Sequence, residues 1–184
     1  GDELSESSSE GTVNEENIYT YDEVGNVITE TDKTNNITTS YKYDEFLRVI
    51  KTTETAQVNG KKTTKNTENG YDKNGSKIKS VDEEGRITEY TYDSMNRVIE
   101  TKLIVGSDEK VTRTAYSYGS VSINTGKVMM TVKNATVTTI TNTSDEVVGK
   151  TYTDSLGRTV RELNNGLYVD YTYDNDGRIF TTYT

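Results

Sequence analysis

The sequence predicts an all-β protein: an antiparallel sheet built from successive hairpins. Three observations predict it: a Tyr-x-Tyr-Asp motif that recurs along the chain, turns that begin with its Asp, and Thr, Val and Ile between the turns. Such motifs end at Asp22, Asp44, Asp93 and Asp174. Self-similarity at a period of roughly 20–50 residues indicates a repeat architecture.

The composition allows one domain or one continuous repeat array of 184 residues. Only 30% of the residues are hydrophobic, so a conventional two-layer core would be thin. Tyrosine is abundant, with 14 residues, and it favours a pleated, half-buried surface, as threonine does. The periodic placement of these residues argues against disorder for most of the chain.

The charge and the missing residue types exclude several kinds of function. A net charge of −9 repels phosphate backbones and anionic lipids, so we expect no nucleic-acid partner. No apolar run is long enough to span a bilayer, so we expect no direct membrane insertion. The absence of cysteine and histidine removes disulfides, thiolate chemistry and the usual nucleophile–base pairs.

Residues 1–16 are rich in Ser and Glu and carry almost no apolar side chain. This composition predicts a flexible acidic leader. Such a leader commonly follows a removed export signal or lipid-anchor site. The simplest interpretation is a disordered end that serves only as a spacer. Together with the family resemblance given below, the leader favours an extracellular or cell-surface protein of a bacterium, lipid- or wall-anchored through a segment that precedes residue 1.

The ordered chain should begin near Asn17. Residues 17–21, 27–31 and 37–43 read as strands, separated by turns at residues 22–25 and 32–35. In the pattern Asp-x-x-Gly, the Asp side chain accepts backbone N–H groups at the start of the turn. The residue three positions later must be left-handed, which only Gly and Asn adopt at low cost.

The same turn pattern recurs further along the chain, starting at Asp72, Asp82, Asp93, Asp154 and Asp174. In the segment 44–47 it is broken, because Leu47 occupies the left-handed position, where a leucine is costly. We therefore expect a different turn there. Asn59-Gly60, in the less regular segment 52–69, predicts a two-residue hairpin turn.

Residues 105–149 look like degenerate repeats: strands at 121–123, 128–132, 136–143 and 147–153, with a turn at 124–126. The path of this part, continuing the sheet or folding over it, is left open. In total we expect about fifteen strands, spaced by about ten to twelve residues. Short connections make sequence neighbours antiparallel neighbours in space. A two-layer β-sandwich or a partly closed barrel is the alternative.

The motif string resembles the YD repeat, also called the RHS repeat: Tyr-x-Tyr-Asp-x-x-Gly-Arg-(Val/Ile), a second turn, and Tyr-x-Tyr-Asp again. The best matches are residues 19–44, 71–97 and 152–179. The resemblance implies an elongated, curved strip of hairpins over residues 17–184 that curls or spirals. In family members such as bacterial RHS toxins, the strip encloses a polypeptide.

Neither catalysis nor a bound cofactor is expected. The Asp residues already have a structural role in turns, so a glycan-active hydrolase built on two carboxylates is a weak alternative. A calcium loop needs six or more converging oxygens, which no acidic turn supplies, so we expect no metal. No Gly-rich phosphate loop precedes a helix, so no nucleotide cofactor is expected.

The paired tyrosines are the feature best suited to contact a ligand, although packing of the sheet explains them better. Aromatic rows can stack on sugars or peptides, and open sheet edges can accept a strand. The candidate contact residues are Tyr19, Tyr21, Tyr41, Tyr43, Tyr90, Tyr92, Tyr171 and Tyr173.

The sequence thus predicts a non-enzymatic bacterial surface or secreted repeat module with a structural or adhesive role. Its expected partners are cell-surface glycans or other surface proteins, and self-association through edge strands is open to it. The alternative is a fragment of a larger RHS-type toxin shell that encapsulates a polypeptide.

Overall fold

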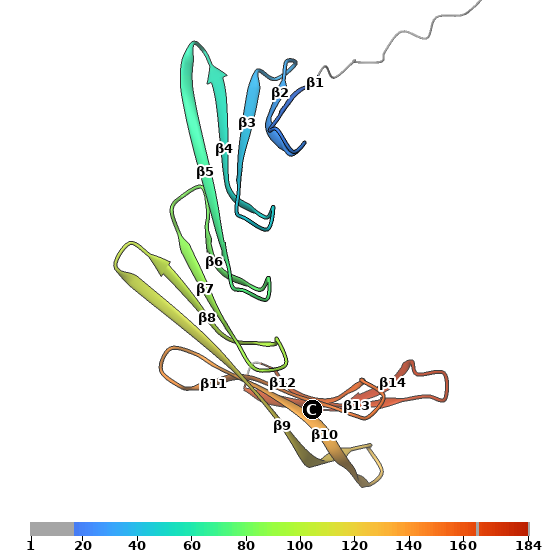
Figure 1. The fold of residues 1–184 in the computed structure, drawn as a ribbon. Helices are drawn as coiled ribbons and strands as arrows, with labels where there is room; N and C mark the ends of the chain where they lie inside the picture. The colour runs from blue at the N-terminus through green and yellow to red at the C-terminus, as the bar shows by residue number, and fades with distance from the viewer. Residues whose placement is uncertain (1–16, 165, 184) are drawn as a thin grey trace, which may run out of the picture. The chain divides into compact units, whose positions relative to one another are not determined.

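The structure, a computed structural model, describes residues 17–164 and 166–183. The predicted acidic leader, residues 1–16, lies outside the described residues. The described chain is entirely strand and turn, with no helix (Figure 1). It divides into two compact units: the first holds residues up to 70 together with 81–84, and the second holds 71–80 and 85–184.

The first unit is an open antiparallel sheet whose strands pair in sequence order. Its strands are β1 (Asn17–Tyr21), β2 (Val27–Asp32), β3 (Ile37–Tyr43), β4 (Val49–Val58) and β5 (Lys61–Tyr71). Asn59 and Gly60 join β4 to β5 with φ of 51° and 76°, which confirms the predicted two-residue turn. No residue in this unit whose burial is described is fully buried, so the sheet is held by pairing rather than by a core.

The second unit continues the same pattern, and β7 to β14 pair antiparallel in sequence order. Its strands are β6 (Lys77–Val81), β7 (Ile87–Tyr92), β8 (Val98–Val105), β9 (Asp108–Asn124), β10 (Met129–Thr141), β11 (Val147–Thr153), β12 (Thr159–Asn164), β13 (Leu167–Tyr173) and β14 (Ile179–Tyr183). The predicted all-β fold of successive antiparallel hairpins is confirmed. In neither unit does the sheet close into a barrel.

Two strands are much longer than predicted. The segments expected at 128–132 and 136–143 are one strand, β10, and β9 runs through Tyr116 and Val121 without a break. A bulge between Val132 and Ala135, where Asn134 has φ of 54°, lets β10 bend without ending. Fourteen strands are therefore described where about fifteen were predicted.

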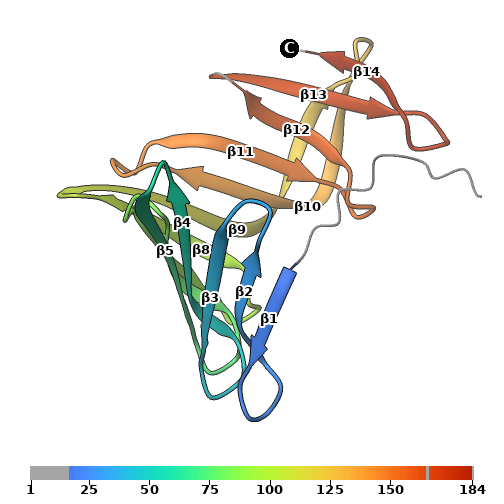
Figure 2. The ribbon, with the colours of Figure 1, turned by 90° about the horizontal axis from the view of Figure 1, so that it is seen from above.

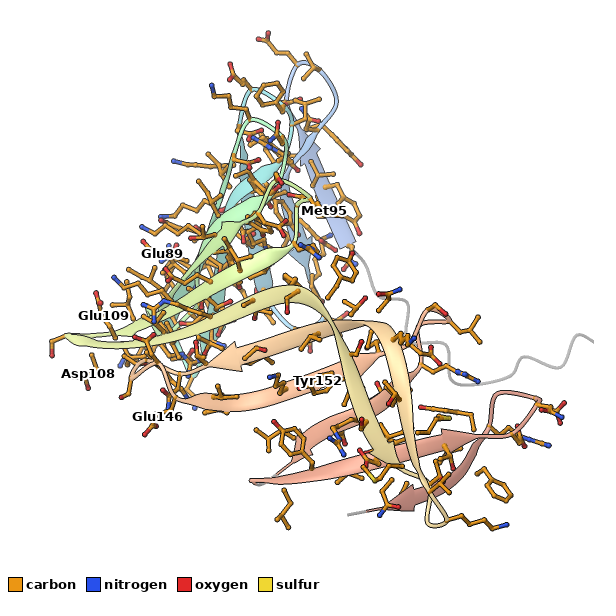
Figure 3. All side chains as sticks on the ribbon, turned by 90° about the horizontal axis from the view of Figure 1, so that it is seen from below. Glu89, Met95, Asp108, Glu109, Glu146 and Tyr152 are labelled. Carbon is orange, nitrogen blue, oxygen red and sulfur yellow. The ribbon has the colours of Figure 1, made fainter. Side chains whose placement is uncertain are left out.

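The bend brings the far ends of β9 and β10 over β12 and β13, as Figure 2 shows within the second unit. Val121, Ile123 and Ala135 from the long hairpin pack on Val160 of β12, and Ile123 is completely buried. Tyr152, labelled in Figure 3, packs against this cluster. Residues 105–149 thus do both of the things left open: they continue the sheet, and their far end forms a local second layer.

Most acid-led turns adopt the predicted geometry. The turn predicted at 32–35 differs, because its left-handed residue is Asn36, with φ of 58°. Gly25, Gly75, Gly157 and Gly177 have φ between 78° and 94°, and each donates its N–H to the carbonyl of the Asp three residues earlier. Asn96 adopts the same conformation with φ of 59°. The left-handed residue creates the bulge that realigns the strands after the turn.

The prediction of a different turn at residues 44–47 is wrong. Leu47 has φ of 62° and donates its N–H to the Asp44 carbonyl at 3.0 Å, as a Gly would. The Asp44 carboxylate accepts the N–H groups of Phe46 and Arg48, and the Arg48 guanidinium lies 5.1 Å from the centroid of the Phe46 ring. These contacts hold the turn despite the strain of a left-handed leucine.

One copy of this turn was not predicted. Asn142 replaces the Asp, and Asp145 takes the left-handed position with φ of 61°. The Asn142 side-chain oxygen accepts the N–H groups of Ser144 and Glu146, each at 3.0 Å. Its amide N–H donates to the Glu146 carboxylate at 2.8 Å, so the carboxylate belongs to the fifth residue of this turn instead of the first.

Candidate functional site

In four of the turns, the Asp carboxylate is bonded both to the backbone and to an arginine. At Asp93, Oδ1 accepts the N–H groups of Met95 and Arg97, both at 2.9 Å, and Oδ2 accepts Nε–H of Arg97 at 2.7 Å. The same bonds recur at Asp44, Asp154 and Asp174. Each of these turns is therefore closed by an ion pair between its first and fifth residues.

These contacts also determine the protonation of the carboxylates. The backbone N–H and the guanidinium of Arg97 hold the pKa of Asp93 below its usual value of 3.8. Hydrogen bonds from Arg48 lower the pKa of Asp44 in the same way. An ionised carboxylate with both oxygens occupied is poorly suited to donate or accept a proton in catalysis.

In three of the four motifs, the second tyrosine is bonded to the turn of the preceding hairpin. The hydroxyls of Tyr43, Tyr92 and Tyr173 donate to the carbonyl oxygens of Val27, Lys77 and Thr159 at 2.7, 2.7 and 2.6 Å. In each case the acceptor is the residue five positions after the turn's Asp. These hydroxyls therefore bond neighbouring hairpins to each other.

An arginine completes this contact where the turn carries one. The guanidinium of Arg158 lies 4.8 Å from the centroid of the Tyr173 ring, and that of Arg97 lies 4.0 Å from the Tyr116 ring. Tyr116 also donates to the Val98 carbonyl, at 3.4 Å. We call the combination of ring, arginine and carbonyl the turn–tyrosine contact. Sequence reasoning missed Tyr116 because a Gly replaces the Asp that follows the other pairs.

In three motifs, the first tyrosine donates its hydroxyl to a glutamate on the neighbouring strand. Tyr19 and Tyr41 donate to the two oxygens of Glu30, at 3.0 and 3.3 Å. Tyr171 donates to Glu162, and this hydrogen bond raises the pKa of Tyr171 to about 12. These bonds fix the hydroxyl end of each ring against a side chain of the neighbouring strand.

Two candidate tyrosines have no hydroxyl hydrogen bond within the described residues: Tyr21, which is 57% exposed, and Tyr90, which is half-buried. The candidates therefore divide into six whose hydroxyls are bonded and two whose hydroxyls are not. A ligand contact by any of the eight stays a prediction.

In the second unit, Tyr171 and Tyr173 line a pocket of about 390 Å³ beneath the far end of β9 and β10. Ile123, Met130, Val132 and Val160 form its apolar part, and Asp154 and Arg158 form its polar edge. Of the eight candidate tyrosines, the structure brings only these two into it. The long hairpin builds this pocket, and no local sequence signal marks the fold-over that creates it.

An ion pair between Asp170 and Arg161 holds the far end of β9 over the pocket. Asp170 is only 4% exposed, and its Oδ2 accepts the backbone N–H of Asn124 and Nη2–H of Arg161, both at 2.7 Å. Burial raises the pKa of Asp170, but the hydrogen bonds from Arg161 and Asn124 outweigh it and keep the pKa low. The ionised carboxylate thus ties β9 to β13.

A second, more open pocket of about 480 Å³ lies at the base of the same long hairpin. Asp93, Arg97, Arg113 and Tyr116 are among its lining residues. Arg113 also pairs with Glu100 and with Asp145 across the hairpins. Its charged groups are therefore already partnered within the sheet.

Comparison with known proteins agrees with this geometry. Residues 71–107 match the family model described as RHS Repeat, which confirms the predicted resemblance over that segment. No curated protein matches the chain. Taken with the turns and tyrosines, the match supports a structural repeat module.

A solved structure shares the fold at low sequence identity. A crystal structure of TcdB2-TccC3 without its hypervariable C-terminal region is 12% identical, with a TM-score of 0.51, over 86% of this chain and 8% of that chain. Crystal structures of TcdB2-TccC3-Cdc42 and of TcdB2-TccC3 are each 13% identical, with TM-scores of 0.46 and 0.45. Each covers 86% of this chain, which spans only 9% and 10% of theirs.

Proposed function

We propose that this chain is a non-enzymatic module of a bacterial surface or secreted protein, and that it binds protein partners through the pocket of its second unit. The observation that carries the proposal is the pocket under β9 and β10, where apolar side chains meet Tyr171 and Tyr173. Protein interfaces favour such a combination of tyrosine, arginine and apolar groups.

The chemistry of the turns supports a role without catalysis. The carboxylates of Asp44, Asp93, Asp154 and Asp174 are bonded to backbone and arginine, and the sequence contains neither histidine nor cysteine. Among the described residues, no helix is long and apolar enough to cross a membrane.

The pocket lining favours a peptide side chain over a sugar. Ile123, Val132 and Val160 offer no hydrogen-bonding groups, and the hydroxyls of Tyr171 and Tyr173 are already engaged with Glu162 and Thr159. A sugar ring needs several free polar partners, whereas an apolar or aromatic side chain needs only area. Glycan contact is therefore the second possibility.

Two neighbouring methionines provide a matched test. Met130 lines the pocket, whereas Met129, which is 62% exposed, is not among its lining residues, since successive strand residues face opposite sides. Met130→Glu should abolish binding to an immobilised peptide library, and Met129→Glu should leave it unchanged.

The same proteins should also be applied to a glycan array. Signal on glycans alone, lost in Met130→Glu, would assign the site to sugars instead. Equal binding by both variants would place any contact outside the pocket. Circular dichroism spectra of the two variants should match that of the wild type, which separates loss of binding from loss of fold.

A second candidate is a segment of a larger RHS-type shell that encloses a polypeptide. The share of the matched chains that this chain spans, 8% to 10%, favours it. The sequence of the parent gene discriminates between the two. A long run of further RHS repeats would support the shell, whereas an export signal followed by this chain alone would support the surface module.

A further inference from the structure

The far end of the long hairpin has a strand edge with which no other described strand pairs. β10 pairs with β11 only from Thr136 onward, where Thr136 lies opposite Thr153, the last residue of β11. Before Thr136, the outer edge of β10 runs along Met129, Met130 and Thr131, all of which are exposed. This edge lies in the interior of the chain, between two hairpins of the second unit.

The pairing with β9 shows which way the backbone groups of this edge point. The Asn124 N–H donates to Asp170, so it points away from β10. Asn124 lies opposite Met129, and the backbone groups of both residues in such an antiparallel pair point outward. The N–H and carbonyl groups of Met129, and of Thr131 two residues later, therefore point to the open edge. Within the described residues, no hydrogen bond engages these groups.

The pocket under β9 and β10 opens along the same edge. Ile123 of β9 lies opposite Met130 of β10, and both side chains line the pocket. Ile123 is completely buried, whereas Met130 is 46% exposed. Burial therefore decreases from β9 to β10, which places the mouth of the pocket beside the outer edge of β10.

The edge carries no charge. Residues 128–132 read Val-Met-Met-Thr-Val, with Lys127 and Lys133 on either side. Proteins normally protect an open edge with charged residues or proline, because its unpaired groups invite another strand. An uncharged edge beside an apolar pocket has instead the two features that bind an extended peptide: main-chain hydrogen-bonding groups, and space for alternate side chains.

We propose that the edge of β10 at residues 129–132 binds an extended segment of a partner protein, which adds as an antiparallel strand and fills the pocket with alternate side chains. This inference rests on the function proposed above and specifies the ligand of the same pocket. The segment residue opposite Thr131 exchanges hydrogen bonds with it and points away from the pocket. Its two neighbours lie opposite Met130 and Val132, which line the pocket, so their side chains point into it.

The two faces of the segment therefore need different residues. On the pocket side the segment meets Ile123, Val132 and Val160, so its side chains there are apolar. On the other side it continues the exposed face that carries Thr131, so its side chains there are polar. Antiparallel addition is favoured over parallel addition because antiparallel pairing is slightly more stable per residue.

The first test is binding of the 184-residue protein to immobilised synthetic peptides in which threonine alternates with leucine or phenylalanine. N-methylation of the threonines, whose N–H groups face β10, should abolish binding. N-methylation of the apolar residues should leave binding unchanged, because their N–H groups face away from β10. Loss of binding through the apolar positions, or equal loss through both sets, would overturn the antiparallel arrangement.

Two proline variants test the edge from the side of the protein. Thr131→Pro removes an N–H that points to the open edge and puts a ring in its place, so the affinity for these peptides should fall by about tenfold or more. Ser122→Pro is the matched control, because Ser122 lies opposite Thr131 and its N–H points outward on the β9 side. Both variants lose the same 3.3 Å contact between the two hydroxyls. Ser122→Pro should bind like the wild type, and matching circular dichroism spectra establish that both variants are folded.

The outcomes separate this inference from the proposed function. If Met130→Glu abolishes peptide binding and Thr131→Pro does not, the pocket remains the binding site and the strand pairing is overturned. If Met130→Glu has no effect, or no peptide binds, both proposals fall. Sedimentation velocity tests a different occupant: a wild-type dimer that Thr131→Pro converts to monomers would assign the edge to a second copy of the chain and overturn the proposal.

Discussion

The left-handed leucine at the 44–47 turn gives a quantitative test of the turn chemistry. Leu47 has φ of 62° and is 58% exposed, so most of its side chain adds little packing. A residue with a Cβ pays about 1–2 kcal/mol in this conformation, which Gly avoids. Gly loses about 0.5–1 kcal/mol through the greater freedom of its unfolded chain. Leu47→Gly should therefore be about 0.5–1 kcal/mol more stable than Leu47→Ala.

The comparison with Leu47→Ala matters because both variants remove the rest of the side chain. Urea denaturation followed by tyrosine fluorescence and circular dichroism gives the difference in unfolding free energy. Hydrogen exchange at the Leu47 and Arg48 amides, which bond to Asp44, reports the turn itself. If Leu47→Gly is no more stable than Leu47→Ala, the left-handed backbone of residue 47 does not strain the turn.

Two glycines in the second unit provide the control. A Cβ added at Gly157 meets nothing within 4 Å, but φ is 81°, so Gly157→Ala should destabilise by about 0.5–1 kcal/mol. Gly149 lies in β11 without a positive φ, and its added Cβ would touch Ile140 at an ordinary 3.6 Å. Gly149→Ala should stabilise by about 0.4–1 kcal/mol. Opposite signs at the two sites would establish that conformation, rather than loss of glycine, sets the effect.

Three further outcomes are expected. Tyr173→Phe keeps the ring but loses a 2.6 Å hydrogen bond to a carbonyl, so its unfolding free energy should fall by about 0.5–1.5 kcal/mol, whereas Tyr21→Phe should change nothing measurable; equal effects would contradict the assigned bond. Arg97 lowers the pKa of Asp93 in the folded protein, so this pair stabilises the fold fully above the unfolded-state pKa near 3.8. Urea titrations at several pH values should show this stabilisation lost as pH falls through the lower pKa of the folded state. Asp93→Asn should remove this loss, and an unchanged decrease of stability at low pH would exclude the pair as a contributor. Asp170→Ala leaves a half-buried arginine unpaired and should cost about 3–5 kcal/mol, with faster hydrogen exchange first at the far ends of β9 and β10; a loss under 1 kcal/mol, on the scale of an exposed pair, would mean that water reaches this site.

The repeated elements could be predicted from sequence because each depends on a few residues close together. At Asp22, Asp72, Asp93, Asp154 and Asp174, an Asp followed three residues later by Gly or Asn predicts the turn, since the carboxylate and the left-handed residue act within five positions. Leu47 was mispredicted because a local steric rule was applied without the compensating contacts of Asp44, Phe46 and Arg48. The turn at Asn142 was missed because an amide takes the place of the Asp carboxylate, and the carboxylate belongs to Glu146 at the end of the turn.

The candidate site depends on contacts distant in sequence, and local patterns do not show them. Tyr171 and Tyr173 were singled out for their spacing, but their pocket exists only because β9 and β10 fold back over β12 and β13. The hydrogen bond from the Asn124 N–H to Asp170 holds β9 over β13, and neither residue belongs to a Tyr-x-Tyr-Asp motif. Likewise, the hydroxyls of Tyr43 and Tyr173 donate to backbone carbonyls, which any residue type supplies.

The turn–tyrosine contact has a consequence for how such a gene can change. Every hairpin of this kind offers a carbonyl on one side and a phenol on the other, and the carbonyl is the same whatever its side chain. In-frame duplication or deletion of one whole hairpin would therefore leave its former neighbours facing a surface they already fit. Chains of this design can lengthen or shorten by recombination without any new pair of residues having to arise together.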